Sequence, residues 1–263
     1  DQIINMIVGR TLEEKFPHRE SRIGDVMFEV KDIQVPDTIY DISFTLRKGE
    51  VLGFSGLVGS GRTSTAKAII GAIPRTSGEI FINGQKVKVT NPAEAIANGI
   101  GYLPEDRKTE GLILTKSVKE NISLPSLQRK FKRGFILDGK KERDAAEEYR
   151  DKLRIKTPGI NRLSKFLSGG NQQKVVFAKW LCSEASIYIF DEPARGIDVG
   201  AKSEIYQIIN NLVGQGAAVI VISSELPEIL GICDRVIVMR DGRITANIDR
   251  ADATQEKIMS YSI

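Results

Sequence analysis

Histidine, cysteine and tryptophan are scarce in this chain of 263 residues, which contains one histidine, two cysteines and one tryptophan. The single histidine, His18, excludes a metal site built from several histidines. Cys182 and Cys233 are far apart in the sequence and lack the close spacing of zinc ligands. We therefore interpret them as buried thiols of a cytosolic protein.

The sequence also lacks long apolar runs and a strong charge bias. No apolar run reaches the roughly 20 residues of a membrane-spanning helix, and the first residues do not follow the pattern of a signal peptide. The net charge of +4 is too small to indicate a nucleic-acid partner. Hydrophobic residues make up 41% and charged residues 27%, as in ordinary soluble proteins. The length predicts one large α/β domain with a sizeable core.

The most informative stretch lies where a buried strand is expected to lead into a helix. Residues 51–54 predict the strand, and residues 64–70 predict a helix that ends at Gly71. Between them the chain reads Gly56-Leu57-Val58-Gly59-Ser60-Gly61-Arg62-Thr63. This order is typical of a phosphate-binding loop, because the backbone N–H groups of the turn and the helix N-terminus attract an anion. Thr63 would offer its hydroxyl to the magnesium ion of a bound nucleotide.

One position of this loop departs from the usual pattern, since Arg62 replaces a lysine. Arginine keeps the positive charge, but its planar, bulkier fork is not an equivalent phosphate ligand. The loop alone therefore favours phosphate binding and a chance glycine-rich turn about equally, and the other motifs must decide.

A second glycine-rich segment precedes another expected helix. It reads Leu167-Ser168-Gly169-Gly170-Asn171-Gln172, and the helix that follows carries Val175, Ala178, Leu181 and Cys182 on one face. A Ser-Gly-Gly sequence at a helix start offers free N–H groups and a hydroxyl without side-chain bulk, which suits an anion. The alternative is a simple N-cap with flexible glycines.

Two adjacent carboxylates follow the apolar run 187–190. A strand that ends in Asp191 and Glu192 places both side chains at the carboxyl edge of a parallel sheet, where α/β proteins bind ligands. Asp191 suits a magnesium ligand, and Glu192 suits a base that orients water. Paired acids could instead begin a solvated loop, but a preceding phosphate-binding loop makes the functional interpretation preferable.

The remaining pattern predicts how the chain is organised. Residues 1–24 read as a linker packed on the surface of a domain that begins at Asp25, and the first residue, which is not methionine, suggests a fragment. Alternating strands and helices predict a largely parallel sheet with right-handed crossovers. Residues from about 115 to 165 predict a helical insertion with a modest core of its own.

Together these motifs resemble an ATP-binding cassette (ABC) domain from roughly Asp25 to the C-terminus. The phosphate-binding loop, the Leu-Ser-Gly-Gly signature and the Asp-Glu-Pro end of a strand, in that order, are highly specific. The finer match is to the second, C-terminal cassette of bacterial monosaccharide importers of the ribose, galactose and xylose type. It rests on residues 59–63, 103–108, 167–174, 195–200 and 223–225.

The resemblance implies an α/β P-loop NTPase fold with a mainly parallel core sheet, an antiparallel β subdomain and an α-helical subdomain at about residues 115–182. Residues 1–24 would be the connector from an upstream cassette of the same polypeptide, and residues 25–263 the ABC domain.

The resemblance also implies a role for each motif. The residues that would cradle the phosphates of ATP are Gly56, Leu57, Val58, Gly59, Ser60, Gly61, Arg62, Thr63 and Ser64. Thr63 and Asp191 would hold Mg²⁺, and Glu192 would polarise the attacking water. Glu105 stands where most cassettes have the glutamine that senses the γ-phosphate. The signature Leu167, Ser168, Gly169, Gly170, Asn171 and Gln172 would contact ATP held by the opposite cassette, and Asp198 would cross the dimer interface.

Several positions depart from the family pattern. Ser224 replaces the switch histidine, Glu105 replaces glutamine and Arg62 replaces lysine. No aromatic residue near residues 35–36 is placed to stack on adenine. Loss of one such ligand typically lowers a rate ~10²–10³-fold. We therefore expect the nucleotide site of this cassette to be slow or inert, although Asp191 and Glu192 are intact. The signature is undamaged.

Three functions are compatible with the resemblance. The first is an ATPase half that powers sugar uptake, bound peripherally at the cytoplasmic face of the bacterial inner membrane. Its partners would be permease subunits and, indirectly, a periplasmic sugar-binding protein. The second is a regulatory half that binds nucleotide without hydrolysis. The third is a soluble ABC protein of translation or DNA repair, which should carry nucleic-acid-binding arms or a coiled-coil insertion that we do not find.

The segment 103–108 is a further candidate for function. A buried strand feeds it directly, Pro104 stiffens its exit, and the resemblance places the docking helix of the membrane subunit against this region. Glu105 would sense the γ-phosphate, and residues 110–117 would carry the contact. Charge reversal at Arg107 or Lys108 should then lower sugar uptake or complex assembly more than it lowers ATP hydrolysis by a soluble protein that contains both cassettes. The alternative is a solvated loop whose charges only aid solubility.

Overall fold

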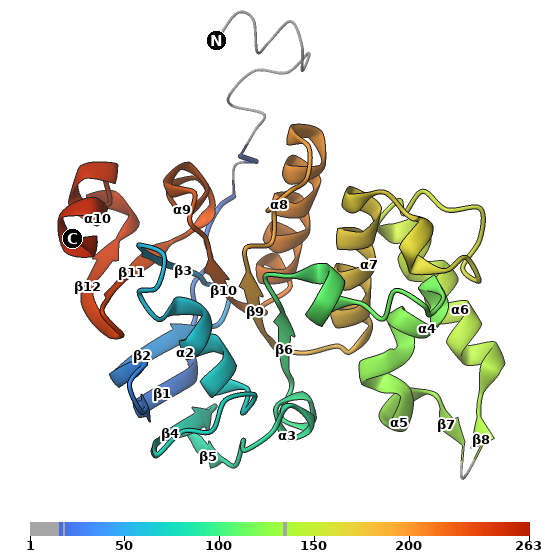
Figure 1. Ribbon diagram of the computed structural model, residues 1–263, viewed down its shortest axis with the longest axis horizontal. Coiled ribbons are helices and arrows are strands. Elements are labelled where there is room, and N and C mark those ends of the chain that lie inside the picture. Colours follow the sequence, from blue (N-terminus) through green and yellow to red (C-terminus); the bar gives the residue numbers. More distant parts are fainter. Residues whose placement is uncertain (1–15, 18, 134–135) are drawn as a thin grey trace, which may run out of the picture.

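The computed structural model describes residues 16–17, 19–133 and 136–263 (Figure 1). Residues 1–15, which form most of the predicted connector, and His18 lie outside the described residues. Both cysteines are buried, as predicted. None of the helices within the described ranges is long and apolar enough to span a membrane.

The central sheet has six strands in the order β12-β11-β3-β10-β9-β6. Their bounds are Arg243–Asp249, Arg235–Arg240, Val51–Gly56, Ala218–Ile222, Ile187–Asp191 and Ile100–Leu103. All neighbouring pairs are parallel except β11 and β12, which form a hairpin. Residues of β9 and β10 are buried throughout, because both faces of the sheet are covered, and this accounts for their continuous apolar sequence.

A second, antiparallel sheet has the order β2-β1-β4-β5. Its strands are Ile39–Arg47, Val26–Val35, Ser77–Ile82 and Gln85–Val87. The apolar side chains of β1 and β2 form one core with α2 (Arg62–Ile69) and with Leu52 and Phe54 of β3. The other face of the central sheet packs in a second core with α8 (Val199–Gly214) and α9 (Leu226–Ile232). The predicted α/β fold with an antiparallel subdomain is confirmed.

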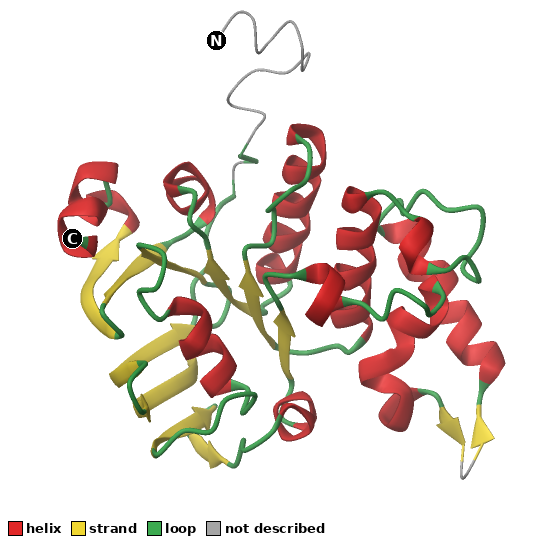
Figure 2. Cartoon of the chain, viewed as in Figure 1, coloured by secondary structure: helices red, strands yellow, loops and turns green. Residues whose placement is uncertain are grey.

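The third part of the fold is helical and lies beyond β6, away from the antiparallel sheet (Figure 2). Its main helices are α4 (Val118–Ser123), α5 (Leu127–Lys130), α6 (Gly139–Lys152) and α7 (Gly169–Cys182). Shorter turns are η2 (Arg107–Gly111), η3 (Leu124–Ser126) and η4 (Ser164–Phe166), and β7 (Lys132–Arg133) pairs with β8 (Ile136–Leu137). The remaining elements of the chain are α3 (Pro92–Ala97), η5 (Arg250–Asp252) and α10 (Gln255–Ser262).

The prediction that the helical insertion has its own core is wrong. Val118, Ile122 and Ala146 belong to the same apolar cluster as Phe177 of α7 and Phe190 of β9. The predicted apolar face of α7 was also too narrow, because residues 172–180 are all buried. Helix α7 lies between the sheet and the other helices, so it is covered on nearly all sides (Figure 1).

Burial of α7 includes a lysine. The Lys179 Nζ donates to the Gly111 carbonyl at 3.0 Å, and burial lowers the pKa of its ammonium to about 8. This contact ties α7 to the end of η2, which begins within the segment 103–108.

The described end of the predicted connector packs on the domain, as expected for residues 16–17 and 19–24. We call residues 16–17 and 19–24 the strap. The Phe16 ring stacks on Tyr206 of α8 with ring centroids 5.3 Å apart. Arg19 forms an ion pair with Asp234 at 2.5 Å and donates to the Gly49 carbonyl at 3.1 Å. Asp234 also accepts from the Val51 amide at 2.8 Å, so one carboxylate joins the strap to the start of β3.

Candidate functional site

The predicted phosphate-binding loop has the expected strand, turn and helix. Strand β3 ends at Gly56, and α2 begins at Arg62, two residues earlier than predicted. Gly56 has φ 150°, and a Cβ there would lie 2.3 Å from the Met239 carbonyl oxygen, so a side chain is excluded. Gly61 is the N-cap of α2 with φ 98°. The glycines therefore let the loop turn tightly beneath a cavity.

A cavity of ≈ 480 Å³ opens above this loop and gathers residues from five parts of the sequence. Its lining includes the predicted residues Val58, Gly59, Ser60, Gly61, Arg62, Thr63, Ser64, Glu105, Asp191, Glu192 and Ser224. Thr38, Arg195, Ile222 and Glu225 also line it and were not predicted as site residues. Arg195 is three residues after Glu192 in the loop that leaves β9. Its closeness to Glu192 in the sequence could have indicated that it lies at the same cavity.

Asp191 is fully buried at the end of β9. Its Oδ2 accepts from the Tyr102 hydroxyl at 3.2 Å, while Oδ1 is buried and has no hydrogen-bond partner among the described residues. Burial raises the pKa of Asp191 to about 6, and the neighbouring Thr63 hydroxyl opposes this shift. An unpaired carboxylate oxygen beside a threonine hydroxyl fits the oxygen ligands that magnesium prefers.

Protein side chains alone do not complete a metal site here. No group of three or more His, Cys, Asp or Glu side chains gathers to hold a metal within the described ranges. Magnesium commonly binds through one or two protein ligands together with substrate phosphates and water. Thr63 and Asp191 fit that pattern, and the cavity beside them has room for phosphates.

Arg62 turns toward the end of β10. Its Nη1 donates to the Ser223 carbonyl at 2.7 Å, and the side chain is buried. Burial lowers the pKa of the guanidinium, while the negative charges of Glu192 and Asp191 raise it. The positive charge of the arginine therefore balances the acidic pair. Its guanidinium also binds a protein carbonyl in this structure, whereas a lysine, which is shorter and has a single side-chain nitrogen, would not require that contact.

Glu192 begins the turn after β9 with φ 49°, a left-handed conformation that is uncommon outside glycine. Its Oε1 accepts from the Ser224 amide at 2.7 Å, and its own amide donates to the Ile222 carbonyl at 2.8 Å. The predicted site residues Glu192 and Ser224 are therefore in contact, through the backbone N–H of the serine.

Glu105 and Arg107 leave β6 on different paths. Glu105 pairs with Arg195 at the cavity, in an exposed ion pair that contributes little stability. Arg107 donates from Nη1 to the Arg195 carbonyl at 3.1 Å, and a Cβ on Gly169 would lie 2.8 Å from its Nη2. The Arg107 guanidinium therefore packs between the signature and the loop after β9.

The signature forms the start of α7, and none of its residues lines the cavity. Ser168 is the N-cap, but its side chain makes no cap hydrogen bond, and its Oγ accepts from Asn171 Nδ2 at 2.9 Å. First-turn N–H groups of α7 therefore lack a side-chain acceptor from Ser168. Asp198 is the N-cap of α8, where its Oδ1 accepts from the Ala201 amide at 2.9 Å.

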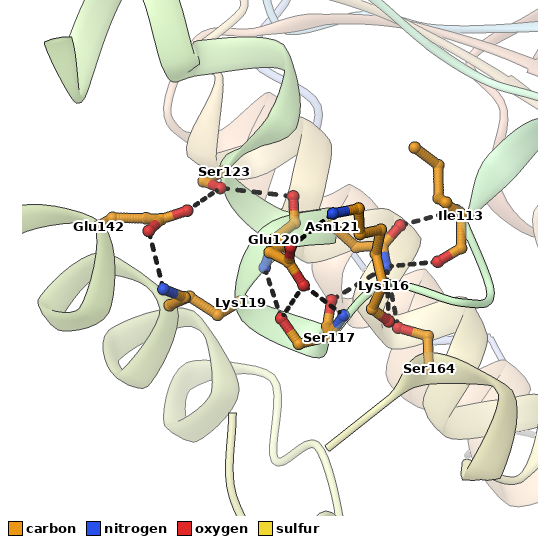
Figure 3. Close-up of polar contacts among 9 residues, drawn as sticks. All are labelled: Ile113, Lys116, Ser117, Lys119, Glu120, Asn121, Ser123, Glu142 and Ser164. Carbon is orange, nitrogen blue, oxygen red and sulfur yellow. Dashed lines mark hydrogen bonds and ion pairs between the residues drawn. The ribbon is translucent and has the colours of Figure 1, made fainter. Parts of the chain in front are cut away.

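The turn that precedes the signature is fixed by a buried amide (Figure 3). Asn121 Oδ1 accepts from the Ile113 amide at 2.8 Å, and Nδ2 donates to Ser164 Oγ at 3.0 Å. A capping box of Ser117 and Glu120 holds the start of α4 beside it. Gly111, Leu112 and Ser117 are buried, so the predicted contact surface 110–117 is partly interior.

Comparison with known proteins places these features in a family context. A family model described as ABC transporter matches residues 39–195. The chain is 49% identical to the ribose import ATP-binding protein RbsA of Clostridium tetani and 51% identical to that of Clostridium perfringens, over 263 residues in each case. It is 50% identical over 263 residues to a putative ribose/galactose/methyl galactoside import ATP-binding protein 3 of Burkholderia ambifaria.

These alignments include 100% of this chain and 52%, 52% and 51% of the relatives, so the chain spans about half their length. A nucleotide-free ATP-binding cassette from an ABC transporter has a TM-score of 0.75 and 18% identity, with 91% of this chain and 99% of that chain covered. A dimeric cassette in a post-hydrolysis state bound to ADP and Pi has a TM-score of 0.73 and 21% identity, with 85% and 99% covered. At these identities the structural likeness shows the fold.

Proposed function

The chain belongs to the ABC transporter family, and from this premise we propose that it is the second ATP-binding cassette of a bacterial monosaccharide importer. It binds ATP with Mg²⁺ and pairs head-to-tail with an upstream cassette of the same polypeptide, here called the tandem protein. The pair couples ATP hydrolysis to sugar uptake at the cytoplasmic face of the inner membrane. The names of the ribose and galactoside relatives support the class of sugar.

One observation carries this proposal. The chain has both a phosphate cavity and an intact signature, but the signature residues do not line the cavity of the same chain. A head-to-tail pair would bring the signature of each cassette to the cavity of the other. The dimeric cassette bound to ADP and Pi supports such pairing within this fold.

The residues of the cavity fit ATP and magnesium. Gly59 and Gly61 would present backbone N–H groups to the phosphates, and Thr63 and Asp191 would hold Mg²⁺, which would neutralise phosphate charge. Glu192, held by the Ser224 amide, could orient a water molecule at the cavity. Helix N-terminal N–H groups at Ser168 would serve the phosphates of the partner's ATP.

We further propose that the nucleotide site of this cassette is degenerate and that its signature is its main catalytic contribution. Arg62 is bound to the Ser223 carbonyl, Glu105 is paired with Arg195, and Ser224 offers no imidazole. These contacts favour a site that binds nucleotide and hydrolyses it slowly. A regulatory half that never hydrolyses ATP is the second candidate, and the same Arg62 contact supports it.

The experiment that tests this function compares the 263-residue chain with the tandem protein. We expect the chain to bind ATP in the presence of Mg²⁺ and to release phosphate much more slowly than the tandem protein. Equilibrium binding of a fluorescent ATP analogue and a phosphate-release assay measure the two quantities. Brisk turnover by the chain alone would refute the degenerate site, and absence of nucleotide binding would refute the function.

An apolar groove is the proposed docking place of the permease. It has a volume of ≈ 400 Å³ and lies between α2, α3, β6 and α7, with Ile73, Ile96 and Trp180 in its lining. The Trp180 Nε1 is buried and has no hydrogen-bond partner among the described residues. Lys67 and Glu110 form an ion pair of 2.8 Å at the groove.

Glu110→Arg should reduce sugar uptake in membrane vesicles more than it reduces ATP hydrolysis by the soluble tandem protein. The substitution breaks the pair with Lys67 and reverses a charge at the groove, while the phosphate cavity stays intact. Lys140→Glu, an exposed charge reversal on α6, is the matched control. Normal uptake by Glu110→Arg would argue against docking at this groove.

A further inference from the structure

Glu228 is a buried carboxylate without a role in the site described so far. It lies in the first turn of α9 and is only 2% exposed. Ser223 Oγ donates to its Oε2, while Oε1 is buried and has no hydrogen-bond partner among the described residues. Burial of a carboxylate with so few partners is costly, so its presence calls for a physical reason.

The partner of Glu228 belongs to the turn that follows β10. The Ser223 carbonyl accepts from Arg62 Nη1 at 2.7 Å, and the Ser224 amide donates to Glu192 Oε1 at 2.7 Å. The Ser223 Oγ also accepts from the Glu225 amide at 3.0 Å. One short turn therefore contacts the cation of the phosphate loop on one side and the acidic end of β9 on the other.

The charged and polar groups around Glu228 affect its hydrogen bond with Ser223. Burial raises the pKa of Glu228 to about 7, and the Ser223 hydroxyl opposes the shift. Glu225 and Glu192 add negative charge nearby, Lys202 adds positive charge, and Tyr206 and Cys233 also face the carboxyl. Loss of the group would leave Ser223 Oγ without its buried acceptor and the turn without its tie to α9.

We propose that Glu228 is a positioning residue of the nucleotide site, which it serves by fixing the turn 223–225. Through Ser223 it keeps the carbonyl that binds Arg62 in place, and through the same turn it keeps the Ser224 amide on Glu192. This inference rests on the proposed nucleotide site. A purely structural Glu228 would stabilise α9 without any effect on Arg62 or Glu192.

The test uses the 263-residue chain and two variants of Glu228. Glu228→Gln keeps an oxygen that accepts from Ser223, whereas Glu228→Leu removes it. Glu50→Gln is the matched control, because Glu50 is also 2% exposed. Its side chain contacts Arg235 and the Arg47 amide. Glu50 lies just before β3, at the opposite end of that strand from the phosphate loop. Amide hydrogen exchange over residues 58–64 and 219–226, without nucleotide, reports the turn and the loop. A fluorescent ATP analogue with Mg²⁺ reports affinity.

We expect Glu228→Leu to accelerate exchange in both segments and to weaken nucleotide binding about tenfold, the effect of losing one buried hydrogen bond of ordinary strength. Glu228→Gln should restore both readouts, and Glu50→Gln should change neither. Unchanged exchange and affinity in a folded Glu228→Leu would overturn the proposal.

If Glu228→Leu does not fold, Ser223→Ala removes the same contact from the other side and keeps the carbonyl that binds Arg62. Accelerated exchange in residues 58–64 of Ser223→Ala supports the proposal, and unchanged exchange overturns it. If the parent chain binds no nucleotide, only the proposed function is refuted. The proposal for Glu228 is still tested, because hydrogen exchange is measured without nucleotide.

Discussion

Ser168→Arg should lower ATP hydrolysis by the tandem protein ~10²–10³-fold, the cost of removing a ligand of the transition state. Ser168 is the N-cap of α7, and its side chain leaves the first-turn N–H groups uncapped. An arginine there would fill the space that a γ-phosphate needs. Because Ser168 does not line the cavity of its own chain, nucleotide binding by the 263-residue chain should be unchanged.

Thr254→Arg is the matched control for this prediction. Thr254 is an exposed N-cap of α10 whose hydroxyl accepts from the Lys257 amide at 3.1 Å. Its loss should cost about 1 kcal/mol of helix stability and leave hydrolysis unchanged. Equal ATPase rates for Ser168→Arg and the parent would show that the signature serves no ATP site.

Asp234→Ala should destabilise the 263-residue chain by about 1–3 kcal/mol, the usual cost of leaving hydrogen-bond donors without their acceptor in a partly buried place. The substitution leaves Arg19 without its carboxylate and the Val51 amide without its acceptor. The strap and the start of β3 would lose their common contact. Urea unfolding followed by circular dichroism measures the change in the free energy of unfolding.

Asp252→Ala, at an exposed position near the same end of the chain, is the control and should change stability by less than about 0.5 kcal/mol. If Asp234→Ala were no more destabilising than Asp252→Ala, the strap would be a passive linker. The predicted loss of stability would instead show that residues 19–24 are part of the folded domain.

The main elements of the fold could be predicted because local sequence determines them. The apolar run 187–190, the loop 56–63 and the capping box at Ser117 each carry their signal within a few residues. The structure brings Asp191, Glu192 and Ser224 to one cavity because they lie at the carboxyl ends of β9 and β10, which are parallel neighbours. Carboxyl ends of adjacent parallel strands meet at one edge of a sheet.

Contacts between distant segments could not be predicted from local patterns. Arg62 and Ser223 are far apart in the sequence, and nothing near either residue indicates their hydrogen bond. Helical periodicity predicts one apolar face for α7. The helix is covered on nearly all sides, however, so polar residues such as Gln173 are buried as well. The side-chain Nε2 of Gln173 donates to the Pro193 carbonyl at 2.7 Å, a contact that only the tertiary fold creates.

The most direct measurement compares ATP turnover by the tandem protein in two variants of this cassette. Glu192→Gln alters the acidic end of β9 in its own cavity, whereas Ser168→Arg alters the signature outside that cavity. We expect Glu192→Gln to retain nearly the parental rate and Ser168→Arg to lose most of it. The opposite result, with turnover abolished by Glu192→Gln and retained by Ser168→Arg, would contradict a cassette that hydrolyses little itself and completes the site of its partner.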